Sequence, residues 1–107
     1  MASDEELIVR DNPSRERYEL LRDDTVVGTI VYDTRPDAVV LIHTEVDRAF
    51  EGRGYGSRLI SGALDDLRAR GLSVVPVCPF VRAYVQRHPE YADLVARDRA
   101  TGDQGTS

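Results

Sequence analysis

Three glycines in the middle of the chain could form a binding site for a phosphate group. Gly52, Gly54 and Gly56 follow the apolar run AVVLIHTEV, which is typical of a buried strand, and they precede a segment with a helical apolar stripe. At the start of a helix several backbone N–H groups lack an intrahelical partner, and the helix dipole places about half a positive charge there. Glycines lack a Cβ atom, so an anion can approach the main chain closely.

The spacing of these glycines does not identify a ligand by itself. Gly-x-Gly-x-Gly is neither the dinucleotide pattern G-x-G-x-x-G nor a P-loop, because no Gly-Lys-Ser/Thr follows. A tight turn that needs positive φ angles would use the same residues. The strand before the loop and the helix after it favour the anion site over the simple turn.

A second group of side chains could carry out proton or acyl transfer. Cys78 is the single cysteine, so it cannot form an internal disulfide and remains a thiol, which is either a nucleophile or a small buried apolar side chain. His43 and Glu45 are two residues apart on an expected strand, so they share one face and could act as a general base. His43, Cys78 and His88 could suggest a zinc site, but no paired ligand spacing such as C-x-x-C or H-E-x-x-H occurs, and we expect no metal site.

The elements that must position these residues alternate with clear turn signals. Polar and proline-containing turns stand at Asp11-Asn12-Pro13, Asp23-Asp24 and Arg35-Pro36-Asp37. They separate expected strands at 7–9, 18–22, 26–33, 38–46 and 72–77, and expected helices at 56–70 and 80–87. A strand, a helix and a strand joined in this order form a parallel pair. The sequence therefore predicts an α+β fold with a mixed, mostly antiparallel sheet of five to six strands, one long helix and one short helix.

The long helix and the fourth strand carry the clearest patterns. The helix has an apolar stripe that must pack on a sheet face, formed by Leu59, Ile60, Ala63, Leu64 and Leu67, and Gly71 should end it. On its exposed side Asp66 and Arg70 are four residues apart and can pair. In the fourth strand, simple alternation puts Val40, Ile42, Thr44 and Val46 on one face, and Val39, Leu41, His43 and Glu45 on the other.

Pro76 predicts where the fourth and fifth strands separate. Proline has no N–H group to donate to a sheet, so pairing of the fifth strand should stop near this residue. The two strands would then diverge at their C-terminal ends, beside the glycine loop. An extended ligand that contains amide groups could lie in such a gap.

Composition and charge restrict the class of protein. With 107 residues, 41% hydrophobic and 31% charged, the chain is expected to be one globular domain over 1–96, followed by a polar, disordered tail at 97–107. The net charge of −5 argues against nucleic acid as a partner. The sequence has no long apolar run, so we expect no membrane span, and its N-terminal segment is acidic, so we expect no signal peptide. The lone thiol fits a cytoplasmic location.

The segment Glu51-Gly52-Arg53-Gly54-Tyr55-Gly56 resembles the acetyl-CoA motif of the GNAT N-acetyltransferase superfamily, Gln/Arg-x-x-Gly-x-Gly/Ala. The surrounding stretches LIHTEVDRAFEGRGYGSRL and VVPVCPFVRAYVQRHPEY are similar to its small single-domain branch, and the likeness covers about residues 5–95. The resemblance implies acetyl-CoA as cofactor and acetyl transfer to an amine acceptor, either a small molecule or a protein lysine or N-terminus. The implied cofactor-binding residues are Val46, Glu51, Gly52, Arg53, Gly54, Tyr55, Gly56, Ser57, Arg58 and Cys78.

The resemblance also suggests two routes for acetyl transfer. In the first, a Cys78 thiolate accepts the acetyl group, and N–H groups of the fifth-strand edge stabilise the oxyanion. In the second, an amine attacks the thioester directly, with Glu45 and His43 as base and Tyr84 as the acid that protonates the departing CoA sulfur. Each of these side chains could instead be structural: a partnered His43, an exposed Glu45, a packed Tyr84.

Two departures from the family pattern bear on function. Glu51 stands where the superfamily has Gln or Arg, and a carboxylate beside a pyrophosphate should weaken binding unless it points away. The family usually places two acceptor-binding helices between its first strands, whereas residues 12–18 leave space for a short turn only. A CoA-binding module without efficient turnover is therefore the alternative function, and a protein-interaction domain with a residual fold is a third. The chain is expected to be a monomer or a weak homodimer.

Overall fold

The computed structural model describes residues 6–95, which form one five-stranded sheet with helices on one side. The strand order follows the sequence: neighbouring strands are antiparallel up to the fourth, and the fourth and fifth are parallel. The mixed, mostly antiparallel α+β fold is thus confirmed. The expected tail at 97–107 lies outside the described residues. The strands are β1 (Leu7–Asn12), β2 (Arg17–Arg22), β3 (Thr25–Thr34), β4 (Ala38–Val46) and β5 (Ser73–Pro76).

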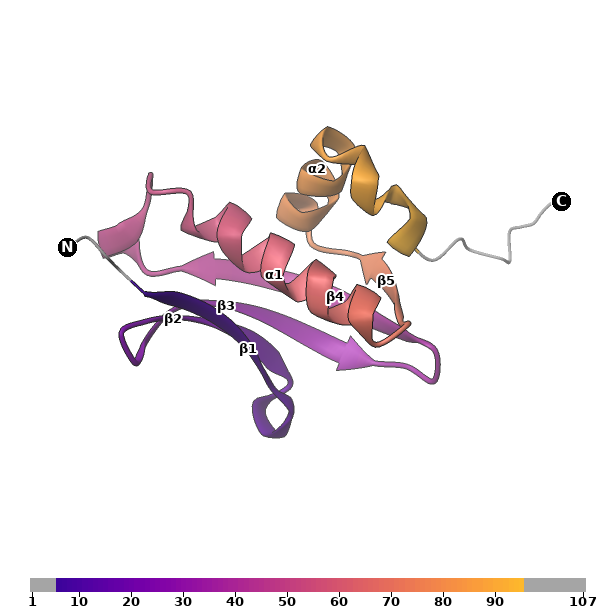
Figure 1. The fold of residues 1–107 in the computed structure, drawn as a ribbon, viewed down its shortest axis with the longest axis horizontal. Helices are drawn as coiled ribbons and strands as arrows, with labels where there is room; N and C mark the ends of the chain where they lie inside the picture. Colours follow the sequence, from indigo (N-terminus) through magenta and orange to yellow (C-terminus); the bar gives the residue numbers. More distant parts are fainter. Residues whose placement is uncertain (1–5, 96–107) are drawn as a thin grey trace, which may run out of the picture.

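Two α-helices cover the same face of the curved sheet, as Figure 1 shows. They are α1 (Tyr55–Ala69) and α2 (Pro79–Arg87), and the shorter 3-10 turns are η1 (Pro13–Arg15), η2 (Arg48–Phe50) and η3 (Pro89–Leu94). The predicted stripe of α1 is buried throughout and packs against the strands and α2. As predicted, only the turn η1 connects β1 to β2. Among the described residues, no helix covers the face of the sheet opposite to α1 and α2. None of the described helices is long and apolar enough to cross a membrane.

The predicted faces of β4 are wrong because the strand contains a β-bulge. Val31 of β3 pairs with His43, but the next residue, Tyr32, pairs with Leu41, so Ile42 is an extra residue. A bulge reverses the alternation beyond it. Leu41 therefore faces the core before the bulge, and Thr44 contacts the buried Cys78 after it.

The predicted separation of β4 from β5 is confirmed. Their pairing ends at Leu41 and Pro76, and β4 continues to Val46 without β5 beside it. The expected fifth strand, 72–77, is shortened at both ends to Ser73–Pro76. We call the place where the two strands diverge the fork; in Figure 1 it lies below the start of α2.

The C-terminal end of α1 is fixed to the sheet by polar contacts. The predicted pair of Asp66 and Arg70 forms with a distance of 3.0 Å, and Arg70 also contacts Asp11 of β1 at 2.9 Å. The Tyr18 hydroxyl donates a hydrogen bond to Asp66 at 2.6 Å. Burial, followed by this hydrogen bond to a carboxylate, raises the pKa of Tyr18, so the hydroxyl remains a donor at neutral pH.

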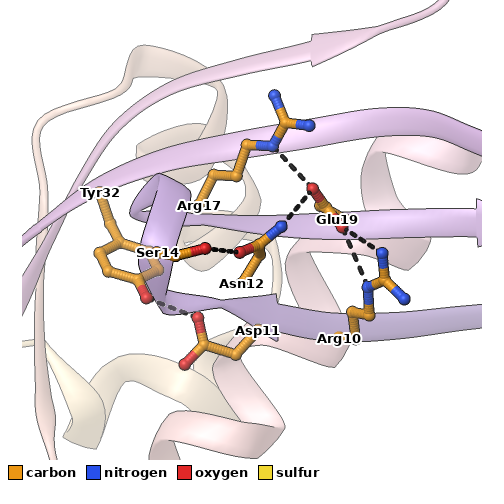
Figure 2. A network of polar contacts seen from close by, with 7 residues as sticks. All are labelled: Arg10, Asp11, Asn12, Ser14, Arg17, Glu19 and Tyr32. Carbon is orange, nitrogen blue, oxygen red and sulfur yellow. Dashed lines mark hydrogen bonds and ion pairs between the residues drawn. The ribbon is translucent and has the colours of Figure 1, made fainter.

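The uncovered face of the sheet contains a buried carboxylate, Glu19 of β2. Its side chain accepts hydrogen bonds from Arg10 and Asn12 of β1, both at 3.0 Å, and from Arg17 at 2.8 Å, as Figure 2 shows. Although Glu19 lies on a face without a helix, its exposed fraction is only 1%. The two arginine side chains therefore cover the carboxylate as well as neutralise it.

Gly62 allows α1 to approach β1 closely, and its replacement by alanine should destabilise the fold. A Cβ atom there would lie 2.5 Å from Cγ2 and 2.7 Å from Cβ of Val9, a β-branched side chain with little freedom to move. Alanine is the better helix former by about 1 kcal/mol, but overpacking costs about 1–3 kcal/mol. We expect Gly62→Ala to lower the free energy of unfolding by up to about 2 kcal/mol in urea titrations.

The same substitution in a Val9→Ala background provides the control. There the contacts with Cγ1 and Cγ2 are removed and only the contact with Cβ, at 2.7 Å, remains, so Gly62→Ala should cost clearly less than in the wild-type background, and the two changes should not be additive. A stabilising effect of Gly62→Ala in the wild-type background would contradict the close contact between α1 and β1.

Candidate functional site

The glycine loop has the backbone conformation of an open anion site. Gly52 has a φ angle of +83° and Gly54 has one of +76°, values that residues with a side chain rarely adopt. A Cβ atom at either position would meet no atom within 4 Å. The glycines are therefore required by the backbone conformation and leave the space in front of the main chain open.

The first turn of α1 directs its N–H groups toward this space. Gly54 is the N-cap residue, and the first helical hydrogen bond runs from the Arg58 N–H to the Gly54 carbonyl at 3.0 Å. The N–H groups of Gly56 and Ser57 precede that bond and have no acceptor within the helix. Such a helix start favours a bound phosphate or carboxylate.

Two adjoining cavities lie between the loop, the free part of β4 and the start of α2. The larger has a volume of ≈ 570 Å³ and follows β4 beyond the fork, whereas the smaller, of ≈ 240 Å³, lies over the glycine loop. Val46, Glu51 and Phe80 line both. Residues lining only the larger are Thr44, Glu45, Asp47 and Arg48; those lining only the smaller are Phe50, Gly52, Gly54, Tyr55, Gly56 and Ser57.

Phe80 is a site residue that the sequence analysis did not identify. Its ring lies 2.8 Å from the position that a Cβ atom of Gly56 would occupy, and 42% of the residue is exposed. The ring thus stands between the starts of α1 and α2, where the two cavities meet. The only signal in the sequence was that Phe80 lies off the stripe of Val81, Tyr84 and Val85, which are the buried residues of α2.

Cys78 lies at the fork as predicted, and its environment favours the thiolate. It is the N-cap residue of α2, is 3% exposed, and its sulfur lies 3.4 Å from the Thr44 hydroxyl oxygen. Burial raises the pKa of the thiol, but hydrogen bonds from Thr44 and from the N–H groups of Val81 and Phe80 outweigh burial and lower the pKa overall. Thr44 was not among the predicted site residues.

The predicted oxyanion donors on the fifth-strand edge are already engaged. The N–H groups of Val77 and Cys78 both donate to the Leu41 carbonyl, at 3.1 and 2.9 Å. This part of the prediction is wrong, because the chain closes the end of the parallel ladder with two bonds to one acceptor. Beyond Leu41, β4 has no strand of the described residues beside it on the side of the fork, so a ligand there would bind along this edge of β4.

His43 and Glu45 share the uncovered face of the sheet, as the alternation predicted for this pair. Their Nε2 and Oε2 atoms are 3.3 Å apart, and both side chains are mainly exposed. Glu45 lines the larger cavity, whereas His43 does not. Among residues 6–95 no three His, Cys, Asp or Glu side chains are grouped to hold a metal ion.

Tyr84 lies on α2 but lines neither cavity. Its ring stacks on His88 with centroids 4.1 Å apart and lies 6.1 Å from the Tyr91 ring. Only 6% of Tyr84 is exposed. The structure therefore places it in an aromatic group at the end of α2, which is the packed role that the sequence analysis kept as an alternative.

The two predicted arginines of the loop are directed elsewhere. Arg53 lies over the Phe50 ring, with 5.5 Å between its guanidinium carbon and the centroid, and Arg58 donates to the Leu7 carbonyl at 3.3 Å. Neither arginine is among the residues that line the two cavities of the site. Tyr55 is 4% exposed and stacks on Phe50, so it supports the loop from within the core.

Comparison with known proteins places this site in a family. A family model described as GCN5-related N-acetyl-transferase matches residues 17–94, which include the sheet from β2 onward, the glycine loop and α2. The chain belongs to the GCN5-related N-acetyltransferase family. The resemblance in the sequence is thereby confirmed, and the family typically uses acetyl-CoA as cosubstrate.

Two members of this family are similar to the chain over part of their length. The [Ribosomal protein bS18]-alanine N-acetyltransferase of Haemophilus ducreyi (strain 35000HP / ATCC 700724) is 31% identical over 52 residues, which are 49% of this chain and 36% of that protein. The crystal structure of Ribosomal-protein-alanine N-acetyltransferase from Brucella melitensis biovar Abortus 2308 has a TM-score of 0.52 at 22% identity, and the match covers 76% of this chain and 61% of that one. The second likeness confirms the fold. The chain spans about a third of the first relative's length.

Proposed function

We propose that this chain binds acetyl-CoA and transfers its acetyl group to an amine. The observation that carries the proposal is the position of the fork, which opens beside the glycine loop and the first turn of α1. The two cavities connect these features and contain the space for an extended ligand. Membership of the N-acetyltransferase family supports the same conclusion.

The two ends of the cofactor would be held by different parts of the site. The N–H groups of the first turn of α1 and the main chain of Gly52 and Gly54 would bind the pyrophosphate. The amide groups of the pantetheine arm would lie along the edge of β4 beyond Leu41, where β5 no longer pairs. The thioester would then lie near the fork, at Thr44 and Cys78.

In the first route, Cys78 carries the acetyl group. Its thiolate attacks the thioester carbonyl, a bond forms from Cys78 Sγ to that carbon, and the bond to the CoA sulfur breaks, so CoA departs as a thiol after taking up a proton. An amine then attacks the Cys78 thioester, loses a proton and leaves as the amide, and Cys78 is regenerated. The lowered pKa of Cys78 and its hydrogen bond from Thr44 support this route.

In the second route the amine attacks acetyl-CoA directly. Glu45 lines the larger cavity and would accept the proton of the amine, with His43 beside it. The acid role proposed for Tyr84 has less support, because Tyr84 lines neither cavity. Cys78 also lines neither cavity and meets the larger one only through its contact with Thr44, so the lowered pKa of its thiol is what favours the first route.

One observation favours the alternative function, a CoA-binding module without efficient turnover. Only the turn Pro13–Arg15 connects β1 to β2, so acceptor-binding helices are absent from this part of the chain. Calorimetric titration with acetyl-CoA, together with an assay of CoA release in the presence of small amines, lysine peptides and peptides with a free N-terminal alanine, distinguishes the two. We expect acetyl-CoA to bind and CoA to be released. Binding of acetyl-CoA without release of CoA would favour the CoA-binding module, and a folded protein that does not bind acetyl-CoA would contradict both functions.

Replacing Glu51 by glutamine should strengthen cofactor binding. Glu51 is exposed and lines both cavities, so its negative charge lies close to the proposed pyrophosphate position. Removing one repulsive charge at a solvent-accessible site should tighten the Kd for CoA about three- to tenfold at low salt, and less at high salt. Glu90→Gln is the control, since this exposed carboxylate lies on η3 and lines neither cavity. An unchanged Kd for Glu51→Gln would place its side chain away from the phosphates.

A further inference from the structure

The exposed apolar side chains of this protein gather around the fork. Five large hydrophobic residues are exposed among the described ones, and Ile42, Val77 and Phe80 are three of them, with exposed fractions of 41%, 50% and 42%. A fourth, Val31, is 38% exposed and pairs with His43, the neighbour of Ile42. Scattered apolar residues on a surface need no explanation, but a group around one opening indicates a binding surface.

The backbone explains why Ile42 and Val77 stand together at the fork. Leu41 and Pro76 form the last pair of the parallel ladder, so Ile42 and Val77 are the first residues beyond it, one on each branch of the fork. The bulge at Ile42 exposes this residue as well as His43. Phe80 lines the larger cavity.

This apolar rim of Ile42, Val77 and Val31 lines neither cavity, but it stands next to the larger one, whose lining carries negative charge. Glu45, Asp47 and Glu51 line the larger cavity, and Arg48 is the one basic side chain among its lining residues. Glu45 has an exposed side chain, and an exposed histidine, His43, lies beside it. A cavity with this charge attracts an ammonium group. The outer face of the sheet, without a helix, leaves the opening accessible to a ligand.

We propose that the acceptor is a primary amine attached to an apolar group, whose ammonium lies toward Glu45 and whose apolar part contacts Ile42, Val77 and Val31. This inference rests on the proposed acetyl transfer and specifies its acceptor. A small aralkylamine and a peptide with an apolar N-terminal residue share this chemistry. A hydrophilic amine or a polyamine would satisfy the carboxylates but leave the apolar rim exposed to water.

Acceptors of similar basicity test the proposal. Initial rates are measured with 2-phenylethylamine, ethanolamine and spermidine, and with tripeptides that begin with leucine or serine. We expect kcat/KM to be about tenfold or more higher for 2-phenylethylamine than for ethanolamine or spermidine, and for the leucine peptide than for the serine peptide, mainly through KM. Comparing the amines with the peptides shows whether a small amine or a peptide N-terminus is the better acceptor.

Variants connect the preference to the rim. Ile42→Ser and Val77→Ser should each raise KM for 2-phenylethylamine about three- to tenfold and leave ethanolamine unchanged. Ile8→Ser is the matched control, because Ile8 is the fifth exposed hydrophobic residue, at 51%, and lies on the far edge strand β1. Calorimetry with 2-phenylethylamine on the CoA-saturated protein should show the same order of affinity without turnover.

The outcomes separate this inference from the function on which it rests. If CoA binds and amines are acetylated, but ethanolamine or spermidine is preferred, the inference is overturned and the acetyltransferase stands. The same holds if Ile42→Ser and Ile8→Ser behave alike in a protein with unchanged thermal unfolding. If the folded protein neither binds CoA nor acetylates any amine, both proposals fail.

Discussion

Replacing Cys78 by alanine should abolish acetylation of the protein itself and lower the rate of amine acetylation at least about a hundredfold. The reason is that Cys78 is the only side chain at the fork that can form a thioester, and its pKa is lowered by its hydrogen bonds. Rapid quenching after mixing wild-type protein with acetyl-CoA should show a mass increase of one acetyl group. The increase should be absent in Cys78→Ala and in the closer structural match Cys78→Ser.

The composition of the chain makes this experiment unusually clear. All basic residues other than histidine are arginines, so there is no lysine side chain to be acetylated. Apart from the amino terminus, a stable adduct on a strong nucleophile can therefore only be on Cys78. Neutral hydroxylamine removes a thioester but not an N-acetyl group, which distinguishes the two positions. A wild-type protein that turns over without any hydroxylamine-sensitive adduct would favour direct transfer.

Thr44→Val tests the cause of the lowered pKa. The hydroxyl of Thr44 stabilises the thiolate, so its removal should raise the pKa of Cys78. A group whose pKa is raised loses its proton at higher pH, and the pH profile of adduct formation should shift upward. An unchanged profile would mean that the N–H groups at the start of α2 determine the pKa without Thr44.

The elements that carry the site could be predicted because short-range patterns determine them. The stripe from Leu59 to Leu67 specifies α1, and its residues are all buried. Pro76 specifies the end of the β4–β5 ladder, since a missing N–H group is a local property. Gly52 and Gly54 specify the loop, because their positive φ angles exclude most other residues.

The remaining features depend on contacts between distant segments. The bulge at Ile42 arises from the register of β4 against β3, which alternation within β4 cannot show. Phe80 is placed by the approach of α2 to Gly56, a contact between separate elements. Glu19 looks like an ordinary exposed strand residue, and its burial depends on Arg10 and Asn12 of the neighbouring strand.

Glu19→Gln should be among the most destabilising single substitutions in the chain, lowering the free energy of unfolding by about 2–4 kcal/mol at neutral pH. The carboxylate accepts hydrogen bonds from Arg10, Asn12 and Arg17 at once (Figure 2). In a carboxamide one of the two oxygens is replaced by an NH2 group, whose N–H donors would face the donors of these side chains. Urea unfolding of the two proteins measures the difference.

Asp33→Asn provides the matched control, because Asp33 also accepts from an arginine two residues away, at 3.0 Å. Both partners of that pair are about half exposed, with side-chain fractions of 59% for Arg35 and 48% for Asp33. Exposed pairs contribute little, so the change should be about 0.5 kcal/mol or less. Equal effects of the two substitutions would mean that burial adds nothing to the interaction of Glu19.

The contribution of Glu19 should also disappear in acid. Burial raises the pKa of Glu19, but the hydrogen bonds from Arg17, Asn12 and Arg10 outweigh burial and lower the pKa overall. A group with a lowered folded-state pKa stabilises the fold above its unfolded pKa, about 4.3 for Glu, and loses that contribution as the pH falls through the folded value. The difference between wild type and Glu19→Gln should therefore be constant from neutral pH to about 5 and shrink below it. Because all other carboxylates are common to both proteins, a difference that persists far below the unfolded pKa would show that packing, and not the charge of Glu19, holds this face together.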